Sequence, residues 1–87
     1  MNKSTKSSKQ KSARELLAVN LRMLRAERGL TKEELANLAG IDRGYVGQIE
    51  SMARAVSVDI IDRLAHALDV AVVQLFEDRR TAKIGDA

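Results

Sequence analysis

The span from Gly29 to Ser51, reading GLTKEELANLAGIDRGYVGQIES, constrains the fold of this chain more than any other part. Thr31 stands where a helix N-cap belongs, and Glu34 follows three residues later, which is the spacing of a capping box. Gly40 then breaks the apolar pattern at a position suited to the end of a helix. These signals predict a helix over about residues 32–39. Its buried side is assigned to Leu35, Leu38 and Ala39.

A second short helix is predicted directly after this glycine, over about residues 43–51. Ile41 fills the intervening turn, and Asp42 is suited to cap the new helix with its carboxylate. Val46 and Ile49 share one face at helical spacing and are expected to face the interior. Two short helices joined by a tight turn form a helix-turn-helix, which in DNA-binding proteins places its second helix in the major groove.

The leucines before this span predict a longer first helix, over about residues 13–28. Leu17, Leu21 and Leu24 recur at i, i+4 and i+7 and form one apolar stripe. Gly29 follows, and glycine suits the left-handed conformation just beyond a helix C-terminus.

Two more helices are predicted towards the C-terminus. Ser57 is a suitable N-cap for a helix over about residues 58–68, and a last short helix is expected over about 72–77. Their apolar positions are Ile60, Ile61, Leu64 and Leu68 in the first, and Val72, Leu75 and Phe76 in the second. No strand pattern is present, so the predicted fold class is all-α, a compact five-helix bundle.

Length and composition restrict the class of protein. With 87 residues the chain has room for one small domain, and its aromatic content of 2% requires a core of aliphatic residues. There is no cysteine, no apolar run long enough for a membrane span and no apolar signal-peptide stretch, so a cytoplasmic protein is expected. We divide the chain into an arm (1–12), a domain (13–77) and a C-terminal tail (78–87).

The arm is strongly basic. Residues 1–14 carry five Lys and Arg residues and no acidic residue, and the segment is rich in serine without apolar periodicity. Such a segment is expected to be disordered when free. It could contact nucleic acid or serve only as a solubilising tail, and the sequence does not decide between these roles.

From about residue 17 to 77, the chain resembles the Xre family, the Cro and phage-repressor type of DNA-binding domain. The resemblance rests on the pattern GLTxEELAxxAGIxRxYVxxIE, on Arg54 and Ser57, and on LAxALDVxxxxLF ending at Phe76. It implies a five-helix bundle of the phage-repressor type with the third helix in the major groove of double-stranded DNA. It also implies a sequence-specific transcriptional regulator, usually a homodimer on a near-palindromic operator.

The resemblance assigns DNA contacts to the third helix and its flanks. Arg43 could bind guanine or a phosphate, Gln48 could form two hydrogen bonds with adenine, and Lys32 could reach a phosphate or remain an ordinary exposed lysine. Tyr45 could contact a phosphate or pack partly against the core. The full set is Lys32, Arg43, Gly44, Tyr45, Gly47, Gln48 and Arg54.

Two departures from the family pattern affect this set. Gly44 and Gly47 offer no side chain to a base. They permit close approach of the helix backbone to DNA, or leave specificity to DNA shape and the arm, or make DNA binding weak. Met52 stands where the family usually has glycine, which leaves the aim of Arg54 open between phosphate and solvent. Val56 replaces a frequent proline in the same loop.

Two further groups are expected to be structural. Arg25 and Glu50 resemble the family's internal ion pair between the first and third helices, and the alternative is two separate surface residues. A second apolar line on the first helix, together with an apolar residue in the last helix, suggests a dimer contact or tighter internal packing. These residues are Leu16, Val19, Met23 and Val73.

No enzyme, cofactor or metal site is indicated, because His66 is the only histidine and stands apart from any catalytic or metal-binding motif. Two alternatives to a simple regulator remain. One is an antitoxin-like repressor that also binds a toxin partner. The other is a protein-interaction module that retains the fold without selecting DNA.

Overall fold

The structure is a computed structural model that describes residues 11–78. Within this range the chain forms four α-helices and one 3-10 helix, and no strand. They are α2 (Ala13–Glu27), α3 (Lys32–Ala39), α4 (Tyr45–Glu50), α5 (Val58–Leu68) and η1 (Val72–Phe76). The all-α fold class is confirmed, except that the fifth predicted helix is a 3-10 helix one residue shorter than expected. Most of the basic arm and of the C-terminal tail lies outside the described residues.

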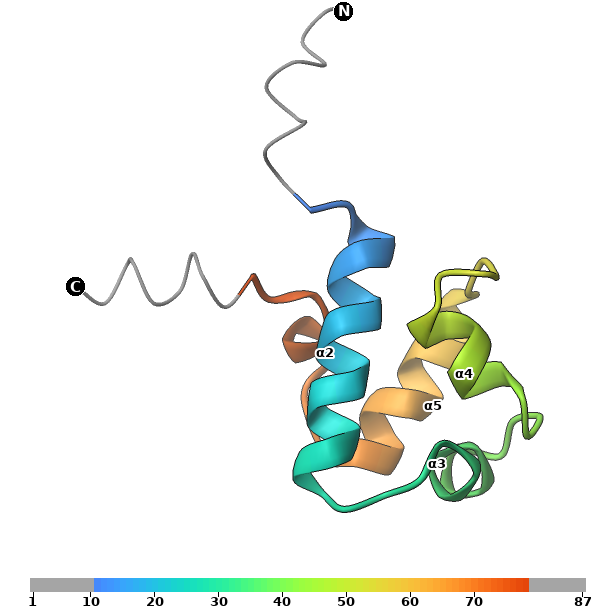
Figure 1. Ribbon diagram of the computed structural model, residues 1–87. Helices are drawn as coiled ribbons and strands as arrows, with labels where there is room; N and C mark the ends of the chain where they lie inside the picture. The colour runs from blue at the N-terminus through green and yellow to red at the C-terminus, as the bar shows by residue number, and fades with distance from the viewer. Residues whose placement is uncertain (1–10, 79–87) are drawn as a thin grey trace, which may run out of the picture.

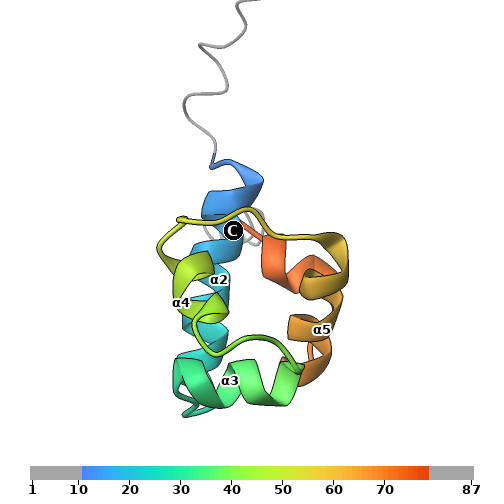
Figure 2. The same cartoon turned by 90° about the vertical axis from the view of Figure 1, so that its right-hand side faces the viewer.

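The helices surround a single core. Helix α2 packs against α4 and η1, whereas α5 packs against α3 and η1. Figure 1 shows α3 and α4 together on the side of the domain away from η1. Figure 2 shows α3 across the bottom of the domain, below α4 on one side and α5 on the other. Helices α3 and α4 therefore contribute to one outer surface, as a helix-turn-helix requires.

The helix starts follow the cap signals of the sequence. The Glu34 N–H donates to Thr31 Oγ1 at 3.0 Å, and the Thr31 N–H donates to Glu34 Oε1 at 2.8 Å, which completes the predicted capping box. The Ile60 N–H donates to Ser57 Oγ at 3.2 Å, so the predicted cap of α5 is also confirmed. A further capping box, at Ser12, fixes the start of α2.

The core is aliphatic, as the composition requires, but two predicted core positions are wrong. Leu38 is 59% exposed, because Leu35, Ala36 and Ala39 form the inward side of α3 and Leu38 lies outside it. Val72 is 42% exposed, since η1 turns chiefly Leu75 inward. The buried leucines, isoleucine and valine are Leu17, Leu21, Leu24, Leu35, Val46, Ile49, Leu64, Leu68 and Leu75.

The third helix starts later than predicted. Helix α4 begins at Tyr45 instead of residue 43, and Gly44 occupies the N-cap position without a side-chain hydrogen bond. The predicted cap by Asp42 is therefore wrong. Its main-chain carbonyl oxygen instead accepts a hydrogen bond from the Tyr45 N–H at 3.0 Å, which closes a turn before the helix. Arg43 and Gly44 belong to this turn.

Candidate nucleic-acid interface

The buried residues of α4 show which side of the helix faces outward. Val46 and Ile49 are 0% and 1% exposed and anchor α4 in the core. Gln48 is exposed on the other side, as are Arg43 and Gly44 in the preceding turn. The predicted division of this segment into an inward and an outward face is therefore present in the structure.

Three of the predicted site residues form one cluster on this face. The Arg54 guanidinium carbon lies 4.2 Å from the centroid of the Tyr45 ring, within the range of a cation–π contact. Arg54 Nη1 also donates a hydrogen bond to Gln48 Oε1 at 3.0 Å. Tyr45 is half-buried and packs against the core, so the core-packing alternative describes its ring. We call Tyr45, Gln48 and Arg54 the Tyr–Arg–Gln cluster.

The loop after α4 aims Arg54 despite the missing glycine. Met52 adopts a φ of 61°, the left-handed conformation that glycine favours, so the methionine takes a backbone conformation suited to the glycine it replaces. The Ala53 N–H donates to the Gln48 carbonyl oxygen at 2.8 Å, which folds the loop back onto α4. The guanidinium of Arg54 is thereby returned to the outer face of the helix.

Lys32 joins the same surface from α3. A Cβ atom placed on Gly47 would lie 3.6 Å from Lys32 Cδ, so the aliphatic part of this lysine lies beside the glycine. A Cβ atom on Gly44 would meet no atom within 4 Å. Neither glycine has a positive φ. The packing and backbone of the described domain therefore do not require glycine at either position.

The predicted ion pair is present and partly buried. Arg25 Nε and Nη2 donate to Glu50 Oε2 and Oε1 at 2.7 and 3.1 Å, and the Glu50 side chain is only 4% exposed. The hydrogen bond to Glu50 is the main cause of a raised pKa of Arg25. Arg25 Nη1 also donates to the Leu30 carbonyl oxygen at 2.8 Å. One guanidinium thus ties α2 to α4 and to the loop that leads into α3.

Arg22 was missed by the sequence analysis. Its Nη2 donates to the Glu50 main-chain oxygen at 3.1 Å, and its Nε lies 3.8 Å from Glu50 Oε1. Arg22 precedes Arg25 by three residues on α2, a spacing that places both on the same side of a helix. This spacing is the sequence signal that could have identified Arg22 as a second partner of Glu50.

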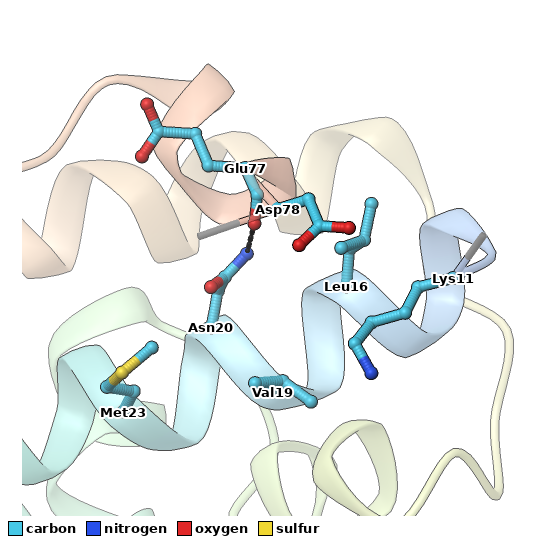
Figure 3. A pocket seen from close by; sticks show the side chains of 7 residues that line it. All are labelled: Lys11, Leu16, Val19, Asn20, Met23, Glu77 and Asp78. Carbon is cyan, nitrogen blue, oxygen red and sulfur yellow. Dashed lines mark hydrogen bonds between the residues drawn. The ribbon is translucent and has the colours of Figure 1, made fainter. Parts of the chain in front are cut away.

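Three of the four predicted dimer-contact residues lie together. Leu16, Val19 and Met23 line a hollow of about 230 Å³ beside the end of η1, and Val19 is 42% exposed. Figure 3 shows these three side chains along α2. Val73 is 64% exposed on η1 but does not line the hollow.

Asn20, in the wall of this hollow, is a second residue that the sequence analysis missed. Its amide nitrogen donates to the Leu75 and Glu77 carbonyl oxygens at 3.1 and 2.8 Å. The bond to Glu77 is drawn in Figure 3. Asn20 is 1% exposed and fastens η1 to α2.

Within residues 11–78, no group of three or more His, Cys, Asp or Glu side chains could hold a metal ion. In the same range, no helix has the length and hydropathy needed to cross a membrane.

The chain matches a known protein family in sequence. The helix-turn-helix family model matches residues 21–75, which include every α4 contact described above. A hypothetical transcription factor from Neisseria meningitidis is 40% identical over 62 residues, and the match covers 71% of this chain but 58% of that protein. The control protein C.SmaI from Serratia marcescens is 37% identical over 62 residues, covering 71% of this chain and 74% of that protein.

Two crystal structures share the fold. The hypothetical transcription factor NHTF from Neisseria superposes with a TM-score of 0.78 at 35% identity, covering 84% of this chain and 85% of that one. The restriction-modification controller protein C.AhdI from Aeromonas hydrophila gives a TM-score of 0.70 at 44% identity, covering 72% of this chain and 96% of that one. The chain therefore belongs to the Xre-type helix-turn-helix family.

Proposed function

We propose that this protein is a sequence-specific, DNA-binding transcriptional regulator that reads the major groove with α4. The observation that carries the proposal is the Tyr–Arg–Gln cluster, which gathers hydrogen-bonding and cationic groups on the outer side of α4. Lys32 adds a second cationic group from α3, beside Gly47. Exposed donors around a short helix suit a surface that carries phosphates and base edges.

The groups on this surface divide into two roles. Lys32 on α3 and Arg43 in the turn before α4 are cationic and exposed, which suits contacts with phosphate oxygens. Gln48 projects from the helix itself and can reach a base edge. Gly44 and Gly47 have no side chain on the outer surface, so the backbone of α4 can approach DNA closely.

The proposal includes a homodimer. Two copies would place their α4 helices in successive major grooves, about 34 Å apart, and would read a near-palindromic operator. Leu16, Val19 and Met23 form an apolar surface on α2, and Val73 adds an exposed valine on η1. Exposed apolar patches of this kind tend to form protein contacts.

The names of the relatives support the same class of function. One relative is described as a transcription factor, another as a control protein and a third as a restriction-modification controller. Since the chain spans 58% of the Neisseria relative's length, the function of that whole protein is carried over only as part of this proposal.

Selection from a random-sequence duplex DNA library by the full chain tests the proposed function. We expect an enriched, near-palindromic sequence, and the Gln48→Ala variant should weaken the base preference at the position that Gln48 reads. Salt-sensitive binding without an enriched sequence would contradict the proposal and favour the protein-interaction module. A stoichiometric protein partner that co-purifies with the chain and releases it from DNA would favour the antitoxin-like alternative.

A further inference from the structure

We propose that Arg54 sets the base selectivity of Gln48, so that Gln48 recognises guanine instead of adenine. The inference rests on the proposed function and specifies the base class that this surface takes. It concerns the side-chain oxygen of Gln48, which would otherwise be available to a base.

The amide of Gln48 is polarised by its neighbour. Arg54 Nη1 donates to Gln48 Oε1 at 3.0 Å, which occupies one acceptor site of the amide and leaves its NH₂ group as the free end. The guanidinium itself has donors only. Gln48 and Arg54 together therefore present neighbouring N–H groups, with a positive charge beside the remaining lone pair of Oε1.

The position of Arg54 does not depend on this hydrogen bond alone. Its guanidinium carbon lies 4.2 Å from the centroid of the Tyr45 ring, and the ring is half-buried against the core. The turn at Met52 and the Ala53 N–H bond to the Gln48 carbonyl oxygen bring the loop back to α4. Arg54 is thus held from two sides.

The two purines differ at the groups that this arrangement would meet. Adenine offers the N7 acceptor and the N6 amino donor, and a glutamine reads it by donating to one and accepting from the other. The positive charge of the Arg54 guanidinium beside Gln48 Oε1 opposes the approach of the adenine N6 amino donor to that oxygen. Guanine offers two acceptors, O6 and N7, which match the neighbouring N–H groups of Gln48 and Arg54. Arg54 therefore acts as a positioning and specificity-determining residue for Gln48.

The test compares base preferences in selections from a random-sequence duplex library. The Gln48→Ala variant identifies the operator position that Gln48 reads, because the base preference changes most there. At that position we expect wild-type protein to prefer guanine over adenine on the order of ten-fold. Arg54→Leu should shift the preference towards adenine, since it frees Gln48 Oε1. Tyr45→Leu removes the ring under Arg54 and should weaken the guanine preference while the charge is kept.

Arg28→Ala, which removes an exposed guanidinium from the end of α2, is the matched control and should leave the preference unchanged. A wild-type preference for adenine, or an unchanged guanine preference in Arg54→Leu, would overturn the inference while leaving the proposed function intact. Failure of wild-type protein to enrich any sequence would instead reject the proposed function. Circular dichroism of each variant shows whether a lost preference reflects unfolding.

Discussion

Arg25 holds Glu50 through two parallel hydrogen bonds, of 2.7 and 3.1 Å, and so connects the last turn of α2 to the last residue of α4. Glu50 is buried, and both Arg25 and Arg22 lie within ion-pair distance of its carboxylate. The pair joins the C-terminal end of α4 to α2, two residues from Gln48 in the sequence. A buried ion pair thus supports the helix that carries the proposed DNA surface.

Breaking this pair should destabilise the domain strongly. We expect Glu50→Gln to lower the free energy of unfolding by about 3 kcal/mol, because it leaves the guanidinium of Arg25 partly buried without its counter-charge. Urea denaturation measures the change. Glu27→Gln is the control, since Glu27 is 52% exposed and lies 3.9 Å from Arg28, and exposed pairs contribute at most about 1 kcal/mol. Equal effects of the two substitutions would contradict the structural role.

Asn20 supplies a second prediction. Asn20→Asp replaces an amide donor by a carboxylate that faces two carbonyl oxygens, and we expect it to cost about 3 kcal/mol or more of stability. Asn20→Ala should cost about 2 kcal/mol, because it leaves the buried Leu75 carbonyl oxygen without this donor. Thermal unfolding compares these variants with Asn37→Asp on the exposed side of α3. A neutral Asn20→Asp would show that η1 is not fastened in this way.

The helix boundaries show how far local sequence signals extend. The cap of α3 is predictable because Thr31 and Glu34 are three residues apart, and each side chain accepts a hydrogen bond from the other residue's main-chain N–H. Asp42 carries an equally suitable side chain, yet the turn closes through its carbonyl oxygen and moves the N-cap to Gly44. A cap residue is effective only where the backbone conformation matches, and the sequence does not specify that conformation here.

In the candidate site, too, the sequence predicts individual residues but not the contacts that depend on backbone conformation. The sequence identifies Tyr45, Gln48 and Arg54 separately, but not the hydrogen bond between Gln48 and Arg54, which depends on the positive φ of Met52. Asn20 could not be found from periodicity, because its two partners are main-chain oxygens 55 and 57 residues further along the chain. The role of a buried polar side chain such as Asn20 can be recognised only when the positions of its hydrogen-bond partners are known.

The glycine in the middle of α4 allows stability to be separated from binding. Gly47→Ala should raise the free energy of unfolding by up to about 1 kcal/mol, since alanine favours helices and the new Cβ makes only an ordinary contact with Lys32. We expect the same variant to bind the selected duplex more weakly, because the methyl group would stand between α4 and DNA. Chemical denaturation and fluorescence anisotropy measure the two quantities. Unchanged DNA affinity would remove Gly47 from the interface.

The proposed dimer contact is tested by placing a charge in the apolar surface. We expect Val73→Glu to reduce the mass measured by light scattering towards that of one chain, because burying an unpaired carboxylate in an interface is costly. Val58→Glu is the control, as Val58 is 79% exposed at the start of α5. An unchanged dimer would remove Val73 from the interface, and Val19→Glu then tests the α2 face separately.

The salt dependence of binding to the selected duplex tests the central claim, that the surface around α4 contacts DNA. Wild-type protein should lose affinity steeply as salt rises, and Lys32→Ala and Arg43→Ala should each reduce the slope of log affinity against log salt by about one. Arg28→Ala, which removes the same charge from the end of α2, should leave the slope unchanged. Equal slopes for the Lys32, Arg43 and Arg28 variants would contradict the assignment of this surface to DNA.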